Sequence, residues 1–294
     1  MTSALNAAPN AGLDGGVHLA SVMHIYRTDE VEVIALRGVD LDVAPGEAVA
    51  LLGPSGSGKS TLLTILAGLI RPSAGTVRVA GHDVALLSER DLLAFRRTRL
   101  GIMLQGTSRN LLPYASVRDN LHFAQRGSGR SGRQNRARSE ELLALVGLED
   151  LAKHRVTSLS GGEQQRLSLA VGVVNAPAVL LADEPTSQLD QQSADQVAAL
   201  LREVRDRHGT TVVAVTHDEN LAATFDRTIA MRDGRVGTES RHGEAYAVIG
   251  RDGSLQLPTE LIGDLPPGTL VQVVRTERGV ELRPRPKTPA RKDD

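Results

Sequence analysis

Cysteine is absent from this 294-residue chain, and so is any long apolar run or any excess of basic residues. Without cysteine the chain forms neither a disulfide framework nor a thiolate metal site, which fits a reducing cytoplasm. No apolar run approaches the roughly 18 residues that a membrane-spanning helix needs. A net charge of −1 gives no reason to expect nucleic acid as a partner.

The N-terminus also lacks the features of a secretion signal. Residues 1–16 have no charged head followed by an apolar stretch, so we expect a disordered leader. Hydrophobic residues make up 40% of the chain, enough for a sizeable core. The length allows one large domain with a small appendix. Lysine is scarce and arginine abundant, as in many GC-rich bacteria.

Apolar patterning predicts an α/β fold. Residues 17–43 alternate in the manner of antiparallel strands. Short apolar runs predict further strands, and helical spacing predicts helices around 191–207 and through most of 116–175, with a flexible basic loop at 126–138. The predicted strands are 47–53, 75–81, 100–105, 178–184 and 211–217. Strands that alternate with helices imply a mostly parallel sheet with helices on both faces.

The stretch "GPSGSGKS" (53–60) predicts a phosphate site. It matches the pattern G-x-x-x-x-G-K-[ST], between a predicted strand and a predicted helix, which is the context that this motif requires. Glycines let backbone N–H groups turn toward one anion, and the helix N-terminus adds a partial positive charge. A flexible Gly/Ser turn is the alternative. The residues assigned to the phosphates are Gly53, Ser55, Gly56, Ser57, Gly58, Lys59, Ser60 and Thr61.

Two acids end the predicted strand "VLLADE" (179–184). Asp183 at the strand tip is a candidate ligand of Mg²⁺, together with the Ser60 hydroxyl. Glu184 points to the other side and is a candidate general base for an attacking water. A pair of acids that merely ends a strand at the surface is the alternative, but adjacent carboxylates on a buried strand favour a bound cation.

A second predicted anion site lies at "LSGGEQQR" (159–166). Ser160 is placed to cap the next helix, while Gly161 and Gly162 leave backbone N–H groups bare. Two anion sites for one nucleotide are explained if two chains pair head to tail and each caps the other's γ-phosphate.

With these three motifs the sequence resembles the ATP-binding cassette (ABC) family over about residues 17–240. Four more positions match that family in the expected order. The resemblance implies that Tyr26 stacks on adenine and that Gln105 reaches Mg²⁺ and the attacking water. It also implies that Asp190, in "SQLD", lies in a loop that crosses the dimer and that His217 contacts the γ-phosphate. The expected fold is a P-loop NTPase cassette with an antiparallel β subdomain and a helical subdomain at about 106–175.

The resemblance implies an ATPase that uses ATP and Mg²⁺, works as a homodimer and drives a separate membrane permease. Within the family, the sequence is similar to the group that serves macrolide exporters, lipoprotein-releasing complexes and septum-associated transporters. About residues 106–125 would contact the permease, at the cytoplasmic face of a bacterial membrane. A translation or repair ABC protein is the first alternative. The single cassette and the lack of a heptad run argue against it.

After about residue 241 the pattern changes to a small β-rich appendix. Residues 243–283 resemble the AbrB-type swapped-hairpin fold, whose members bind DNA as dimers. This allows another alternative, an ATP-dependent regulator with a DNA-binding module. The segment holds four arginines against six acids, whereas DNA binding needs a basic excess, so we expect a dimer-stabilising or regulatory module. An ordinary β appendix remains open, and residues 284–294 are expected to be a disordered tail.

Overall fold

The computed structural model describes residues 15–27, 31–241, 244–250, 253–257, 269–277 and 279–284. The chain divides into two compact units, Met1–Gln256 and Leu257–Asp294. Most of the predicted leader and all but Pro284 of the predicted tail lie outside the described residues. Gly15 and Gly16, assigned to the leader, belong to the first unit, because their carbonyls accept hydrogen bonds from Thr211 and Ala80.

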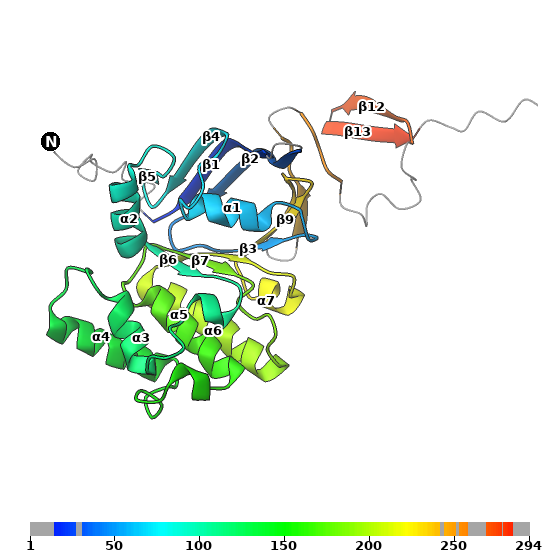
Figure 1. Cartoon of the computed structure of the whole chain (residues 1–294). Helices are drawn as coiled ribbons and strands as arrows, with labels where there is room; N and C mark the ends of the chain where they lie inside the picture. Colours follow the sequence, from blue (N-terminus) through cyan, green and yellow to red (C-terminus); the bar gives the residue numbers. More distant parts are fainter. Residues whose placement is uncertain are drawn as a thin grey trace, which may run out of the picture. The chain divides into compact units, whose positions relative to one another are not determined.

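A seven-stranded sheet forms the centre of the first unit (Figure 1). Its order is β11-β10-β9-β3-β8-β7-β6, with parallel pairing from β9 to β6 and antiparallel pairing at β10 and β11. The strands are β3 (Ala48–Leu52), β6 (Leu100–Met103), β7 (Val179–Asp183), β8 (Thr211–Val215), β9 (Arg227–Arg232), β10 (Arg235–Arg241) and β11 (Glu244–Ala247). The predicted parallel sheet is confirmed.

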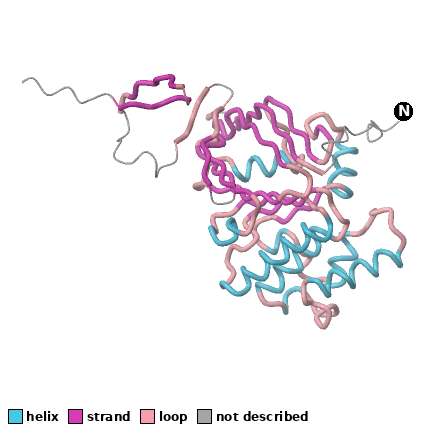
Figure 2. The backbone as a smooth tube through the Cα atoms, turned by 180° about the vertical axis from the view of Figure 1, so that it is seen from behind, coloured by secondary structure: helices cyan, strands magenta, loops and turns pink. Residues whose placement is uncertain are grey.

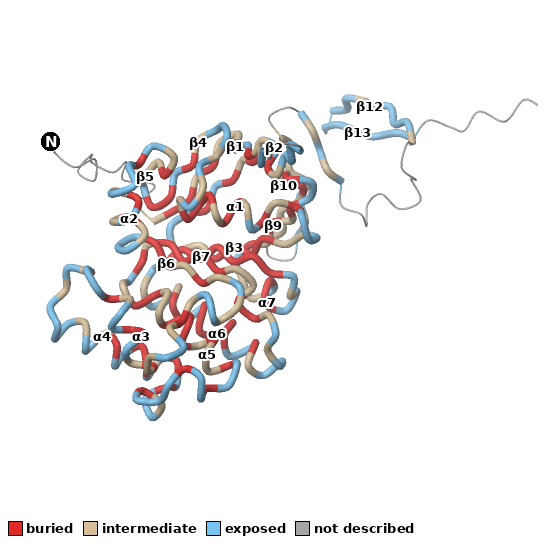
Figure 3. The backbone as a smooth tube through the Cα atoms, in the orientation of Figure 1, coloured by how far each residue is buried: buried red, intermediate tan, exposed pale blue. Residues whose placement is uncertain are grey.

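The parallel strands read as unbroken apolar runs because both of their faces are buried. In β8, Val213 and Val215 enter one core cluster while Val212 and Ala214 enter the other. Figure 3 shows this burial along the central strands. The sheet thus separates two hydrophobic cores, and each core is covered by a different set of elements.

The first core lies beneath an antiparallel sheet and two helices. The sheet has the order β2-β1-β4-β5, and Figure 2 shows its strands from behind. Leu62, Ile65 and Leu66 of α1 pack into this core. The elements are β1 (Val17–Arg27), β2 (Glu32–Val43), β4 (Ala74–Val79), β5 (His82–Asp83), α1 (Lys59–Leu66) and α2 (Glu89–Thr98).

Helices cover the other core, on the opposite face of the central sheet, as the prediction of helices on both faces requires. They are α3 (Val117–Ala124), α4 (Gly132–Leu145), α5 (Gly161–Val173), α6 (Gln191–His208) and α7 (Glu219–Ala223), with short 3₁₀ turns at Thr107–Arg109 and Val156–Ser158. Among the described residues, no helix combines the length and the apolar character that crossing a bilayer requires.

The predicted loop at 126–138 is wrong for its second half, because α4 begins at Gly132. Ser131 forms a capping box: its Oγ accepts the Gln134 backbone N–H (3.3 Å), and the Gln134 side chain accepts the Ser131 N–H (2.9 Å). Two orphan N–H groups are satisfied in this way, so the helix starts despite the arginine-rich sequence. Arg136 and Arg138 then pair with acids one turn further on.

The structure places residues 244–247 in the first unit, although we expected the appendix to start at 243. They form β11, whose register on β10 pairs Glu239 with Tyr246. The second unit contains a hairpin of β12 (Val271–Thr276) and β13 (Gly279–Pro284). The likeness of the appendix to a swapped-hairpin fold stays a prediction.

The capping box of α4 generates a stability prediction. Replacing Ser131 with alanine removes the acceptor for the Gln134 N–H and should lower the free energy of unfolding by about 1 kcal/mol. For a chain of this size the melting temperature should fall by about 2–4 °C, measured by calorimetry. Ser131→Asp keeps a capping oxygen and is the matched control. Equal melting temperatures for the alanine and aspartate variants would contradict this account of how α4 begins.

Candidate functional site

The glycines of the phosphate loop (residues 53–60) are required by both space and backbone angle. A Cβ on Gly53 would lie 2.2 Å from the Met231 carbonyl oxygen, and one on Gly58 would lie 2.6 Å from that of Ala35. Both glycines have positive φ, +145° and +97° respectively. A side chain at either position would therefore force the loop away from the sheet. Gly56 also has positive φ but is open to solvent.

Lys59 begins α1, and its side chain turns back into the phosphate loop. Nζ donates to the carbonyl oxygens of Gly53 (2.7 Å) and Pro54 (2.8 Å) and to Ser57 Oγ (3.3 Å). Lys59 is buried. Burial lowers its pKa, while the negative charges of Glu184 and Asp183 act in the opposite direction. The loop thus holds a positive charge in place before any anion is present.

Asp183 ends β7 and faces the same site. Burial raises the pKa of this carboxyl group, and the charge of Glu184 raises it further, while Lys59 and Arg109 lower it. Asp183 and Ser60 line one small cavity of about 30 Å³. A carboxylate and a hydroxyl fit Mg²⁺, which prefers oxygen ligands and uses few from the protein. Within the described chain, no cluster of three or more acids or histidines offers a fuller metal cage.

Glu184 is held in an uncommon conformation at the predicted position of the general base. Its φ is +51°, a region that costs a non-glycine residue free energy and that occurs often at functional sites. Its N–H donates to the Val215 carbonyl at the end of β8 (2.8 Å). The Nδ1 atom of His217 lies 2.8 Å from Glu184 Oε2, so the imidazole orients the carboxylate. A contact of His217 with the γ-phosphate stays a prediction.

These groups meet because their strands are neighbours. The order β3-β8-β7 places the phosphate loop, His217 and the two acids after the carboxyl ends of three adjacent parallel strands. Ligands in open α/β sheets bind at this edge. The arrangement offers one cation, one carboxylate pair and a backbone anion cradle, the set needed for phosphoryl transfer to water.

Tyr26 lies beside the helix that follows the phosphate loop. Its hydroxyl is 3.3 Å from Thr61 Oγ1 in the first turn of α1, and its side chain stays partly exposed. An aromatic ring at this place can stack on a base attached to phosphates in the loop. The structure thus brings the predicted adenine contact next to the phosphate loop.

Gln105 is exposed in the loop after β6, and Asn110 fixes that loop around it. The Asn110 side chain accepts the Leu104 N–H (2.8 Å) and donates to the carbonyls of Leu104 (2.7 Å) and Gly106 (3.1 Å). The residues on both sides of Gln105 are therefore held. We did not predict this role for Asn110, because a side chain that binds backbone leaves no pattern in the sequence beyond an asparagine in a turn-rich stretch.

The signature turn (Ser160–Gly162) opens α5 as predicted. Ser160 and Glu163 form a capping box, with Ser160 N–H donating to the Glu163 carboxylate (2.7 Å). Gly161 is exposed, whereas Gly162 is buried, and a Cβ there would lie 2.8 Å from Ser193 Oγ of α6. Gly162 therefore has a packing role that the sequence did not reveal.

The signature turn does not lie on the same face of the sheet as the phosphate loop. Helix α1 packs into the first core and α5 into the second, across the central sheet. Asp190 caps α6 by accepting the Ser193 N–H (2.9 Å), and this hydrogen bond lowers the pKa of the exposed carboxyl group. A contact of Asp190 across a dimer stays a prediction.

Two side chains that we did not predict tie α5 to the site. Gln164 accepts the Thr107 hydroxyl (2.8 Å), which links the turn after Gln105 to α5. Gln165 is buried and donates to the Pro185 carbonyl (2.6 Å), directly after the acid pair. The glutamines stand in the sequence motif, but their partners are 57 and 20 residues away and leave no local signal.

Comparison with known proteins agrees with this geometry. The family described as "ABC transporter" matches residues 36–187. The macrolide export ATP-binding/permease protein MacB of Azoarcus sp. is 42% identical over 233 residues, which are 78% of this chain and 35% of that protein. The chain therefore spans about a third of the length of this relative and of the other MacB proteins that it matches.

One further relative and one solved structure match this chain over nearly their whole length. The lipoprotein-releasing system ATP-binding protein LolD 1 of Caulobacter vibrioides is 40% identical over 226 residues, 76% of this chain and 96% of that protein. The ATP-binding cassette MJ0796, in a dimeric post-hydrolysis structure bound to ADP and Pi, is 37% identical with a TM-score of 0.69, covering 76% of this chain and 98% of that one. The chain belongs to the ABC transporter family and forms its ATP-binding cassette, similar to those of the MacB and LolD group.

Proposed function

We propose that this ABC ATPase binds ATP with Mg²⁺, hydrolyses it as a head-to-tail homodimer and thereby drives a separate membrane permease. Its place would be peripheral, at the cytoplasmic face of a bacterial membrane. The observation that carries the proposal is the meeting of Lys59, Asp183, Glu184 and His217 beside a glycine cradle. Two relatives support it: LolD 1 is named as the ATP-binding protein of a lipoprotein-releasing system, and MacB is named as an ATP-binding/permease protein.

The residues divide the chemistry among them. Lys59 and the loop N–H groups bind the phosphates and neutralise negative charge that develops on them. Glu184 accepts a proton from the attacking water, and His217 keeps the carboxylate oriented through the 2.8 Å contact. Asp183 and Ser60 would hold Mg²⁺, which supplies Lewis-acid stabilisation of the phosphate oxygens. Gln105 is available to both the metal and the water, on a loop fixed by Asn110.

A homodimer follows from the position of the signature turn. Within one chain it lies on the far side of the central sheet from the phosphate loop. A second copy turned head to tail would bring its Ser160, Gly161 and Gly162 to the γ-phosphate. The solved structures of the cassette MJ0796 are described as dimeric, which supports this arrangement. Loss of the γ-phosphate would remove the shared contact and open the dimer.

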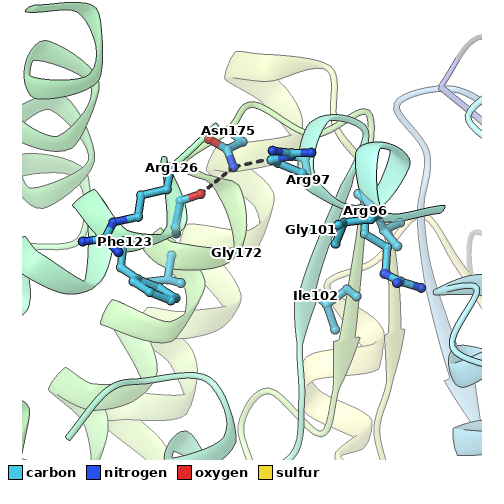
Figure 4. Close-up of a pocket in the computed structure, with 12 residues that line it drawn as sticks. Arg96, Arg97, Gly101, Ile102, Phe123, Arg126, Gly172 and Asn175 are labelled. Atoms are coloured by element: carbon cyan, nitrogen blue, oxygen red, sulfur yellow. Dashed lines mark hydrogen bonds between the residues drawn. The ribbon is translucent and has the colours of Figure 1, made fainter. Parts of the chain in front are cut away.

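A groove at the end of the helical layer is suited to a permease segment. It has a volume of about 480 Å³ and lies between α2, β6, α3 and α5 (Figure 4). Leu93 and Phe123 supply exposed apolar surface, and the Arg126 guanidinium lies 5.2 Å from the Phe123 ring centroid. With Arg97 alongside, the groove fits a helical segment that carries an apolar side chain next to an acid. Phe123 lies within 106–125, where we expected this contact.

The Asn175 side chain joins the walls of this groove. It donates to the carbonyls of Arg97 (3.1 Å) and Ala124 (3.0 Å), as Figure 4 shows. The ends of α2 and α3 are thereby fixed relative to α5. A rigid groove of this kind transmits a push from the cassette to a bound segment better than a loose one.

The appendix keeps its proposed role as a dimer-stabilising or regulatory module. Val271, Val273, Val280 and Leu282 share one face of the β12–β13 hairpin and are exposed. A two-stranded hairpin is only marginally stable in water unless its apolar face is covered by other protein. This supports a role for the appendix in packing against another protein surface. The described residues of the hairpin include two arginines, Arg275 and Arg283, against two acids, Glu277 and Glu281, so they carry no basic excess for DNA. Arg283 also pairs with Glu281.

Glu184→Gln tests the assignment of the general base. The amide cannot accept the water proton at neutral pH, so turnover should fall at least 100-fold while ATP still binds. The variant should also accumulate as a closed dimer with ATP, measured by size-exclusion chromatography and light scattering. Hydrolysis at the wild-type rate would remove Glu184 from the mechanism.

Lys59→Ala tests the phosphate contact. Removing a buried cation from the cradle should weaken ATP binding at least 10-fold, measured by titration calorimetry, because the phosphate charge loses its main partner. Lys153→Ala, on the helical side of the cassette, is the control and should bind ATP as the wild type does. Equal ATP affinity in the Lys59 variant and the wild type would place the nucleotide elsewhere.

The groove generates a charge-reversal experiment. Arg97→Glu combined with Arg126→Glu should leave ATP hydrolysis by the isolated cassette unchanged. It should abolish stimulation by the membrane permease that copurifies with the cassette, reconstituted in nanodiscs. Arg136→Glu, on the exposed face of α4, is the control and should keep the stimulation. Full stimulation of the double variant would show that the permease docks on another surface.

A further inference from the structure

His24 is a buried titratable residue that the proposed mechanism does not use. It lies on β1 opposite Leu36 of β2, and it is 9% exposed. Val22, His24 and Tyr26 alternate along the strand and share one of its faces, and Val22 belongs to the first core. Val22 is fully buried and Tyr26 is 43% exposed, so this row leads from the core to the nucleotide site, with His24 between.

The imidazole of His24 packs against the ring of Tyr26. The ring centroids are 4.6 Å apart and the planes are 84° apart, a T-shaped contact. Aromatic pairs favour this geometry because the positive edge of one ring meets the negative face of the other. The Tyr26 hydroxyl is meanwhile 3.3 Å from Thr61 Oγ1. Two contacts, one at the ring and one at its tip, thus fix the plane of Tyr26.

Hydrogen bonding at the Nδ1 atom does not explain why residue 24 is a histidine. Its Nδ1 atom is buried and has no partner among the described residues. An unpaired buried polar atom is unfavourable, so a histidine here is less stable than an apolar ring of the same shape. The contact that the structure does show for the His24 side chain is the one between its ring and the ring of Tyr26.

We propose that His24 is a positioning residue that holds the Tyr26 ring in the orientation required to stack on the base of ATP. The inference rests on the proposed function, in which Tyr26 contacts adenine. A base gains more net affinity from a ring whose plane is already fixed, because ordering a free ring on binding reduces the affinity. His24 thus acts on base recognition and leaves the phosphate contacts of Lys59 untouched.

The test separates the base from the phosphates. His24→Leu and His24→Phe are prepared with Glu184→Gln, so that binding is measured without turnover. Loss of the T-shaped contact in His24→Leu should raise the dissociation constant for Mg²⁺-ATP about threefold to tenfold. His24→Phe keeps an aromatic ring and should stay within about twofold of the parent, with a higher melting temperature because the unpaired nitrogen is gone. The dissociation constant for Mg²⁺-tripolyphosphate, which has no base, should stay within about twofold in both variants.

Steady-state kinetics with Glu184 intact adds a second readout. His24→Leu should raise KM for ATP by the same factor and change kcat less than about twofold. His82→Leu is the matched control: this residue is another histidine in contact with an aromatic ring, Phe95 at 5.5 Å, two strands away from β1 in the same sheet. It should change neither constant.

Three results would overturn the inference. One is unchanged ATP affinity in His24→Leu, and another is an equal loss of affinity for tripolyphosphate, which would indicate a general structural defect. The third is a loss of ATP affinity in His24→Phe although this variant melts at or above the temperature of the parent protein. If the parent protein itself binds no ATP, the proposed function fails, and this inference fails with it.

Discussion

The charge balance around Lys59 is the interaction on which the rest of the site depends. A buried ammonium group is unfavourable unless charge and hydrogen bonds compensate it. Three oxygens of the phosphate loop and the nearby carboxylates of Asp183 and Glu184 supply that compensation. The carboxylates come from β7 and the lysine from the helix after β3, with β8 between them. The order of the sheet is therefore what makes the charge cluster possible.

Local strain collects where these elements meet. Glu184 has positive φ, and Gly53 and Gly58 leave no space for a Cβ. Such conformations persist only when the surrounding structure determines them. Here two cores, one on each face of the sheet, hold the strands that carry the strained residues. The rigidity of the sheet thus maintains a site whose loops would not keep this shape alone.

The sequence predicted the elements that depend on local patterns. Three motifs lie in the predicted structural context. The phosphate loop precedes a helix, the acid pair lies at the end of a buried strand, and the serine before two glycines caps a helix. Contacts over long sequence distances escaped prediction. The hydrogen bonds of Gln164 to Thr107 and of Gln165 to Pro185 depend on which segments the fold brings together. The contacts of Asn110 with nearby backbone and of His24 with Tyr26 are short in sequence, but they depend on side-chain orientations that leave no pattern in the sequence. The start of α4 was missed for another reason: the arginines around Ser131 concealed a capping box.

Helix α5 connects the parts of the proposed machine. Its first turn carries the signature turn, and Val171 and Gly172 near its end line the arginine-rich groove, roughly 15–20 Å away along the helix. Near its start, Gln164 and Gln165 attach it to the loop after Gln105 and to the residue that follows the acid pair. A displacement of the signature turn by a second copy must therefore also shift the groove, because a hydrogen-bonded helix moves as a rigid element. Under the proposed function, α5 would in this way carry a change at the γ-phosphate to a permease segment docked between α2 and α3.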